Sequence, residues 1–246
     1  MMSAIKRFEG RVAVVTGASR GIGYQVAKAL GAEGAHVIAI ARTVGGLEEL
    51  DDEIRKAGGS ATLVPLDLKD FEAIDRLGAA IYERWKKLDI LVGNAGVLGV
   101  LSPVGHITPK VFEEALAINV TANWRLLRSL DPLLRQSDAG RAVFLTSDMA
   151  EECKPYWSIQ ATTKAALDAL VHTYANETRS MAVCANLFDP GPTRTGLRAK
   201  AMPGENPETL QRPEDVVPAL LALLTPSCTE SGETFSLIEE RLTAVN

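Results

Sequence analysis

Short apolar runs rich in β-branched residues alternate along this chain with longer amphipathic runs. Apolar runs of about four to eight residues are typical of buried strands, and apolar positions that recur every three or four residues are typical of helices. The pattern predicts strands at 11–16, 36–41, 60–66, 88–93, 141–147, 181–188 and 234–238. It predicts helices at 22–33, 45–57, 70–86, 108–136, 157–179 and 213–224.

Two of the predicted strands, Ile90-Leu91-Val92 and Ala142-Val143-Phe144-Leu145, are apolar throughout rather than alternating. Such strands are buried on both faces, which is typical of a parallel sheet covered by helices. Because strand and helix alternate from the first run to the last, the pattern predicts the α/β class. We expect a single doubly wound domain over residues 1–246, with a parallel seven-stranded sheet flanked by helices on both faces.

Composition excludes several function classes. The 246 residues are 46% hydrophobic and 23% charged, with a net charge of -5 and no clustering of Lys and Arg, so no nucleic-acid partner is expected. The N-terminus lacks the apolar segment of a signal peptide, and no apolar run reaches membrane-spanning length, which predicts a cytoplasmic protein without a membrane partner. Cys153, Cys184 and Cys228 fit no metal-ligand spacing with the histidines, so we expect reduced thiols and no metal.

The stretch from Thr16 to Gly23 lies between a predicted strand and a predicted helix, with its glycines spaced G-x-x-x-G-x-G. Glycine permits positive φ and the close approach of an anion. The helix N-terminus behind it offers free N–H groups and the positive end of a dipole. The spacing differs from the G-x-G-x-x-G dinucleotide fingerprint, and no Gly-Lys-Ser/Thr of a P-loop follows. The stretch indicates phosphate binding, with a plain tight turn as the alternative.

Polar motifs follow the later strands. Asn94-Ala95-Gly96 follows the fourth strand, Ser147 ends the fifth, and Lys164 lies in the helix after it. The loop Pro190–Thr195 follows the sixth strand, whereas Asn119 lies within the long predicted helix. In an open α/β sheet, ligands bind at the carboxyl ends of the strands. These motifs therefore predict one site at that edge of the sheet.

Together with the glycine stretch, these motifs resemble the short-chain dehydrogenase/reductase family from Arg11 to about Phe235. The resemblance implies a Rossmann fold, a nicotinamide cofactor, and interconversion of an alcohol and a carbonyl by hydride transfer. The catalytic positions that it implies are Asn119, Ser147, Gln160 and Lys164. The cofactor-binding positions that it implies are Gly17, Ser19, Arg20, Gly21, Ile22, Gly23, Arg42, Asp67, Leu68, Asn94, Ala95, Gly96, Lys164, Pro190, Gly191, Thr193 and Thr195.

The resemblance also implies a role for each group. Asp67 is expected at the adenine, the Pro190–Thr195 loop at the nicotinamide, and Lys164 at the nicotinamide ribose. Ser147 is expected to orient the substrate oxygen, and Asn119 to support a water relay from Lys164. The alternatives are that Ser147 is only a hydroxyl at a strand end and that Asn119 is only a polar residue of a helix.

The end of the second strand indicates which nicotinamide cofactor is bound. An acidic residue there hydrogen-bonds the ribose 2′-hydroxyl of NAD and repels a 2′-phosphate. This chain has Ile40-Ala41-Arg42 instead, and Arg20 lies within the glycine stretch. Two guanidinium groups favour the 2′-phosphate, so NADP is predicted over NAD. The alternative is that Arg42 is an ordinary surface residue.

Gln160 departs from the family pattern, which has a proton-donating Tyr four residues before the Lys. A Gln amide donates hydrogen bonds but releases no proton near neutral pH. Since general acid–base catalysis contributes roughly 10²–10⁴-fold, we expect impaired turnover with cofactor binding retained. Gln160 and Ser147 remain able to polarise a carbonyl as a pair of donors.

Other residues are candidates for the missing acid. Tyr156 lies one helical turn before Gln160, although Pro155 indicates that the helix starts close to that point. Otherwise Tyr156 and Trp157 line the substrate entrance or pack against the helix start. The carboxyl groups of Asp148, Glu151 and Glu152 would need a raised pKa to act as acids.

Two functions therefore stay open: an NADP-dependent reductase or dehydrogenase with a modified site, and a non-catalytic NADP-binding sensor or scaffold. The partner is expected to be a small carbonyl or alcohol. The Pro- and Gly-rich segment 190–213 is a candidate substrate lid, with a short helix near 197–201. The resemblance implies a homodimer or homotetramer that pairs helices 108–136 and 157–179. The apolar positions Ala165, Leu167, Leu170, Val171, Leu126, Leu130 and Leu133 fit such pairing or packing in the core.

Overall fold

Eight strands pair into one sheet in the computed structural model, which describes residues 6–238 and 241–245. Their order across the sheet is β3-β2-β1-β4-β5-β6-β7-β8. Neighbours from β3 to β7 pair parallel, and β8 pairs antiparallel with β7. The strands are β1 (Val12–Thr16), β2 (His36–Ala41), β3 (Ser60–Pro65), β4 (Ile90–Gly93), β5 (Gly140–Leu145), β6 (Val183–Asp189), β7 (Thr234–Ile238) and β8 (Arg241–Val245).

The seven parallel strands confirm the predicted sheet, and the antiparallel β8 is an addition that the sequence pattern did not indicate. Along β7 and β8 the register pairs Thr234 with Val245 and Ile238 with Arg241. Strand β7 ends at Ile238 and β8 already begins at Arg241, so β8 does not belong to the strand–helix alternation from which the other strands were predicted. Its strand character comes from pairing with the edge of β7.

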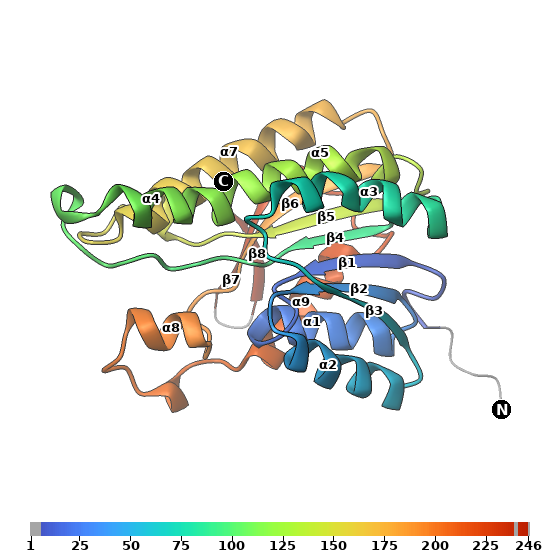
Figure 1. The fold of residues 1–246 in the computed structure, drawn as a ribbon, viewed down its shortest axis with the longest axis horizontal. Coiled ribbons are helices and arrows are strands. Elements are labelled where there is room, and N and C mark those ends of the chain that lie inside the picture. The colour runs from blue at the N-terminus through green and yellow to red at the C-terminus, as the bar shows by residue number, and fades with distance from the viewer. Residues whose placement is uncertain (1–5, 239–240, 246) are drawn as a thin grey trace.

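Helices cover both faces of the sheet, as predicted (Figure 1). One face carries α1 (Gly21–Ala32), α2 (Val44–Lys56) and α9 (Pro213–Leu224), and the other carries α3 (Phe71–Trp85), α5 (Ala122–Leu134) and α7 (Ser158–Glu177). The remaining elements are α4 (Pro109–Leu116), α6 (Met149–Glu152), α8 (Gly196–Ala201), the π-helical segment η2 (Ala117–Thr121), and the 3₁₀ turns η1 (Val104–His106) and η3 (Pro207–Thr209). None of the helices in the described part of the chain is long and apolar enough to cross a bilayer.

The predicted helix 108–136 contains a wide turn. Helix α4 runs into the π-helical segment Ala117–Thr121, which continues directly into α5. A π-turn inserts an extra residue, and such turns often occur at functional sites. Here the turn contains Asn119, which is buried.

The apolar residues on the inner faces of α5 and α7 belong to the core. Leu126, Leu130, Leu133, Leu167 and Val171 are buried in the layer between the sheet and these helices. Burial of each such side chain stabilises the fold by roughly 1.5–3 kcal/mol. These five positions therefore do not offer an outer face for subunit pairing.

The segment 190–213 leaves the sheet at the carboxyl end of β6 and carries α8 and η3. Helix α8 confirms the short helix expected near 197–201, and Thr195 caps it by accepting the backbone N–H of Arg198 over 3.2 Å. In Figure 1 this segment projects beyond the end of the sheet, at the side from which α4 also begins.

Candidate active site

The glycine stretch after β1 is fixed to the loop after β4. The Thr16 hydroxyl accepts the backbone N–H groups of Asn94 (3.0 Å) and Ala95 (3.1 Å) and donates to the Val92 carbonyl. The Asn94 amide donates to the Thr16 carbonyl over 2.8 Å and also reaches the Gly17 carbonyl. Asn94 therefore holds the shape of the turn.

Glycine is required at two points of this turn. A Cβ at Gly23 would lie 2.3 Å from Asn94 Nδ2 and 2.6 Å from the Gly17 carbonyl oxygen. At Gly17, where φ is +67°, it would lie 2.7 Å from the same amide nitrogen. Side chains rarely adopt such a φ, and here there is no room for one. Helix α1 begins at Gly21, so its first N–H groups are available to an anion.

A cleft of about 1030 Å³ opens at the carboxyl edge of the sheet and includes this turn. Nearly every predicted site residue lines it: Gly17, Ser19, Arg20, Gly21, Ile22, Arg42, Asp67, Leu68, Asn94, Ala95, Gly96, Asn119, Ser147, Gln160, Lys164, Pro190, Gly191, Thr193 and Thr195. Gly23 does not line the cleft, because it faces Asn94 and the Gly17 carbonyl from within the turn.

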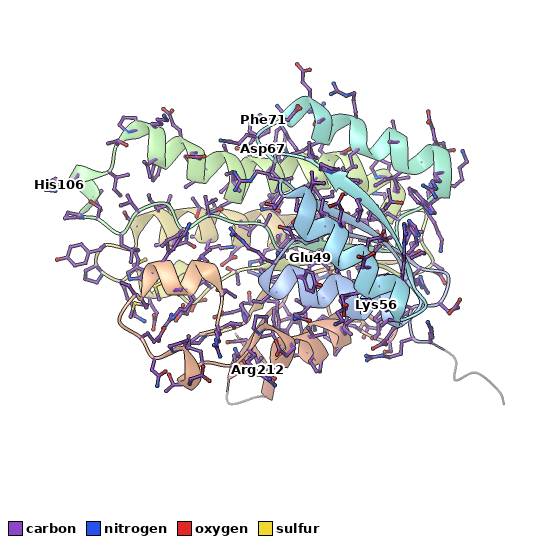
Figure 2. The ribbon with its side chains drawn as sticks, turned by 60° about the horizontal axis from the view of Figure 1, so that its bottom comes forward. Glu49, Lys56, Asp67, Phe71, His106 and Arg212 are labelled. Atoms are coloured by element: carbon purple, nitrogen blue, oxygen red, sulfur yellow. The ribbon has the colours of Figure 1, made fainter. Side chains whose placement is uncertain are left out.

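The half of the cleft that follows β1 and β2 carries exposed positive charge. Arg20 and Arg42 are both exposed, and neither forms an ion pair with any residue in the described ranges 6–238 and 241–245. Asp67 follows β3 just before α3, and Figure 2 shows it near Phe71 at that junction. Its Oδ1 accepts the backbone N–H of Lys69 over 3.0 Å.

Lys164 lies on α7 and lines the cleft. Its side chain is almost fully buried. Its Nζ donates to the Leu145 carbonyl over 2.5 Å. Burial lowers the pKa of Lys164 to about 8, because desolvation disfavours the ammonium more than the nearby Asp168 and Asp189 favour it. The side chain therefore changes charge close to neutral pH.

Gln160, one helical turn before Lys164, faces the loop after β4. Its Nε2 donates to the carbonyls of Val97 (2.7 Å) and Leu98 (3.1 Å). The Asn119 side chain binds the same loop, accepting the Val97 N–H over 2.9 Å and donating to the Val97 carbonyl over 3.0 Å. Asn119 also donates to Thr163 Oγ1 over 3.1 Å. Both amides therefore restrain the wall of the cleft.

Tyr156 is not on the helix that carries Gln160, because α7 begins at Ser158. It has a φ of +74°, is 58% exposed, and does not contribute to the lining of the cleft. The neighbouring Trp157 does line the cleft. Of these two residues, only Trp157 is therefore placed where it could contact a bound substrate.

One buried residue that lines the cleft was not singled out from the sequence. Asp189 ends β6 in a buried position, and its pKa is raised by desolvation and, to a lesser extent, by the charge of Asp148. Its place directly before Pro190 at a strand's carboxyl end is a signal that could have found it. Val97 and Leu98 contribute backbone carbonyls, which no sequence pattern marks.

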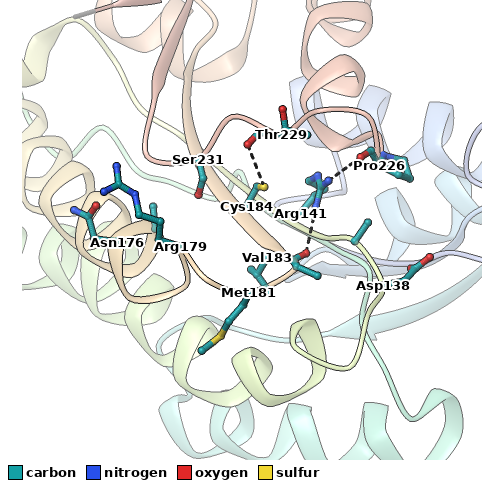
Figure 3. A pocket seen from close by; sticks show the side chains of 13 residues that line it. Asp138, Arg141, Asn176, Arg179, Met181, Val183, Cys184, Pro226, Thr229 and Ser231 are labelled. Carbon is teal, nitrogen blue, oxygen red and sulfur yellow. Dashed lines mark hydrogen bonds between the residues drawn. The ribbon is translucent and has the colours of Figure 1, made fainter.

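A second cavity of about 420 Å³ lies at the amino edge of the sheet, around the starts of β5 and β6 (Figure 3). Its buried Arg141 donates to four backbone carbonyls, those of Gly140, Ala182, Thr225 and Pro226. The guanidinium is therefore satisfied by the protein itself. Because parallel α/β sheets bind ligands at the opposite edge, we place the candidate active site in the larger cleft.

Known proteins resemble this chain over most of its length. A family model described as short chain dehydrogenase matches residues 11–206. YciK, an uncharacterized oxidoreductase of Escherichia coli K12, is 33% identical over 229 residues, covering 92% of this chain and 90% of that protein. A short chain dehydrogenase structure from Pseudomonas syringae is 34% identical with a TM-score of 0.92, covering 96% of this chain and 98% of that chain. Another, from Shigella flexneri and crystallised with NADP, is 33% identical with a TM-score of 0.90, covering 95% of this chain and 99% of that chain. The chain belongs to the short-chain dehydrogenase family.

Proposed function

We propose that this chain is an NADP-dependent oxidoreductase that interconverts an alcohol and a carbonyl, with turnover limited by Gln160. The observation that carries the proposal is the single cleft that brings the glycine turn together with Ser147 and Lys164. The fit to a dinucleotide rests on the chain itself: Gly17 and Gly23 carry no side chain at the two points of the turn where a Cβ would not fit, and α1 presents its N-terminus there. The similar Shigella flexneri chain was crystallised with NADP.

Different residues of the cleft would bind different parts of the cofactor. The turn 17–23 would hold the diphosphate on backbone N–H groups, and Arg20 and Arg42 would bind the 2′-phosphate with charge-assisted hydrogen bonds. Asp67 and Leu68 would flank the adenine, with Asn94, Ala95 and Gly96 beside the adenosine. Lys164, together with Pro190, Gly191, Thr193 and Thr195, would hold the nicotinamide end. When bound, the cofactor supplies or accepts the hydride.

Ser147 would bind the substrate oxygen through its hydroxyl. Gln160 stands where the family resemblance places a Tyr, and its amide donates to two loop carbonyls. Since an amide does not release a proton, the reaction would lack its usual general acid, which is worth roughly 10²–10⁴-fold in rate. Asn119 would support the site by holding Val97.

The same contacts of Gln160 favour a second candidate, a non-catalytic NADP-binding sensor or scaffold. In that case the Gln160 amide would serve only to hold the loop at Val97 and Leu98. We further propose a homodimer or homotetramer built on the outer faces of α5 and α7. Helix α7 exposes the small residues Thr162, Ala165, Ala169 and Thr173 on that side.

Two measurements test the proposed function. NADPH binding is followed by fluorescence titration, and NADPH oxidation or NADP⁺ reduction is followed with panels of aldehydes, ketones and alcohols. The enzyme is expected to bind NADPH more tightly than NADH and to turn over slowly, with turnover lost in Lys164→Ala. Tight NADPH binding with no turnover on any panel would support the sensor instead.

A further inference from the structure

Asp148, the residue after Ser147, forms a hydroxyl–carboxylate pair with it inside the cleft. Ser147 Oγ donates a hydrogen bond to Oδ1 of Asp148 over 2.8 Å. Both side chains line the cleft, and Asp148 is exposed to solvent. The hydroxyl that would bind the substrate oxygen therefore already points its proton at a carboxylate.

An Asp at the N-cap of a helix usually forms a different contact. Asp148 is the N-cap residue of α6, where an Asp side chain ordinarily accepts a backbone N–H of the first turn. Its side chain makes no such capping bond here. Instead, the Met149 N–H donates to Ser147 Oγ over 3.3 Å, so Ser147 takes the capping place and Asp148 receives the hydroxyl.

Asp189 holds the backbone of this pair in place. Its Oδ2 accepts the Asp148 N–H over 3.0 Å, and its Oδ1 accepts the Gly191 N–H over 2.8 Å. These bonds join the end of β5 to the loop after β6. The backbone at Asp148 is thus held by a buried residue of the neighbouring strand.

The other polar groups of this half of the cleft have different partners. The Gln160 amide binds the Val97 and Leu98 carbonyls, and Lys164 Nζ binds the Leu145 carbonyl. We propose that Asp148, working through Ser147, is the proton acceptor of this chain in alcohol oxidation. The inference rests on the proposed function and assigns the step for which Gln160 is unsuited.

The proton and electron balance of the step is complete. The carbinol C–H bond breaks, and the hydrogen with its electron pair goes to the nicotinamide of NADP⁺, which is reduced to NADPH. The alcohol O–H proton passes to Ser147 Oγ while the Ser147 hydroxyl proton passes to Oδ1 of Asp148. The alcohol is oxidised to a carbonyl, and the exposed Asp148 returns the proton to solvent. Carbonyl reduction follows the reverse path.

The charges around Asp148 come from three further elements. Asp189 faces it from β6, Arg198 from α8, and Lys154 from the loop before α7. Arg198 is held by Glu205 at 2.7 Å, and Lys154 is paired with Glu152. The two cations attract the Asp148 carboxylate, whereas the Asp189 carboxylate repels it.

Asp148→Asn tests the inference, because it keeps the side-chain shape and removes the proton acceptor. We expect kcat for alcohol oxidation to fall about 10²-fold or more, with KM and NADPH affinity unchanged. Asp148→Glu, which returns a carboxylate, should restore part of the lost rate. Glu151→Gln, which removes a carboxylate from α6 outside the cleft lining, is the matched control and should behave as the native chain.

A readout without turnover uses the cofactor-free protein. The Met149 amide donates to Ser147 Oγ, so its NMR resonance should differ between the native chain and Asp148→Asn, in which Ser147 no longer donates to a carboxylate. An Asp148→Asn variant with the native rate, or a Met149 resonance at the same position in both proteins, would overturn the role of Asp148 alone. A native chain that oxidises no alcohol and reduces no carbonyl would overturn the proposed function together with it.

Discussion

The two halves of the cleft differ in what fixes their geometry. In the proposed cofactor half, the geometry is set by the backbone of the glycine turn, which Thr16 and Asn94 hold in place through hydrogen bonds. The proposed reaction half is a set of side chains after β5 and on α7, of which Gln160 and Lys164 point to carbonyls of the protein. Adding one Cβ to the glycine turn would disrupt the turn itself. A single side-chain substitution in the other half would change its chemistry and leave the fold intact. Binding and turnover are therefore separable in this chain.

The sharpest test of that difference is Gln160→Tyr. A Tyr acid at this position, in place of the indirect route through Ser147 and Asp148, should raise kcat/KM for carbonyl reduction by roughly 10²-fold or more. NADPH affinity should change little, since the cofactor half is untouched. Steady-state NADPH oxidation measures the gain, and Gln160→Leu, which removes the amide bonds without adding an acid, should show none. Equal activity of the two variants would place the defect elsewhere.

The reverse test adds one methyl group to the cofactor half. In Gly23→Ala the new Cβ would meet Asn94 Nδ2 at 2.3 Å and the Gly17 carbonyl at 2.6 Å, so the turn must open. NADPH affinity should fall about 100-fold, a cost of about 2.7 kcal/mol in binding. Fluorescence titration measures it. Gly45→Ala on α2, which has nothing within 4 Å, is the control, and native affinity in Gly23→Ala would contradict the role of the turn.

Lys164 should make the unfolding free energy of the chain depend on pH. Burial lowers its pKa from 10.5 to about 8, so between these pH values the unfolded chain binds more protons than the folded one and stability rises with pH. The unfolding free energy of the native chain relative to Lys164→Met should therefore rise by about 3 kcal/mol from pH 8 to pH 10.5. Urea unfolding of the cofactor-free proteins measures it. A constant difference would mean that the ammonium is solvated.

The smallest expected effect concerns the choice of cofactor. Arg42→Ala should weaken NADPH binding about tenfold and leave NADH binding unchanged, because only the 2′-phosphate would lose its partner. The effect should shrink at high salt, since Arg42 is exposed. Arg76→Ala, which removes an exposed guanidinium of α3 outside the cleft, controls for net charge. Equal losses of NADPH and NADH affinity would remove Arg42 from this role.

Much of the fold followed from local patterns. Strands that are apolar throughout, such as β4 and β5, could be recognised because burial on both faces leaves no polar positions. The edge strand β8 could not, because its pairing with β7 depends on the rest of the sheet. The π-turn around Asn119 was missed for a related reason: an extra residue in a helix depends on what its side chains contact, here Val97 and Thr163.

Residue type and short-range geometry were enough to predict the alternation of the seven parallel strands with helices, the glycine turn, and the spacing of Ser147, Gln160 and Lys164. The direction of each side chain became visible only in the folded chain: Gln160 donates to the Val97 and Leu98 carbonyls, Ser147 donates to Asp148, and Asp189 accepts the backbone N–H of Asp148. A hydrogen bond needs a partner within about 3 Å, and the loops after β4, β5 and β6 come that close only once the sheet has formed.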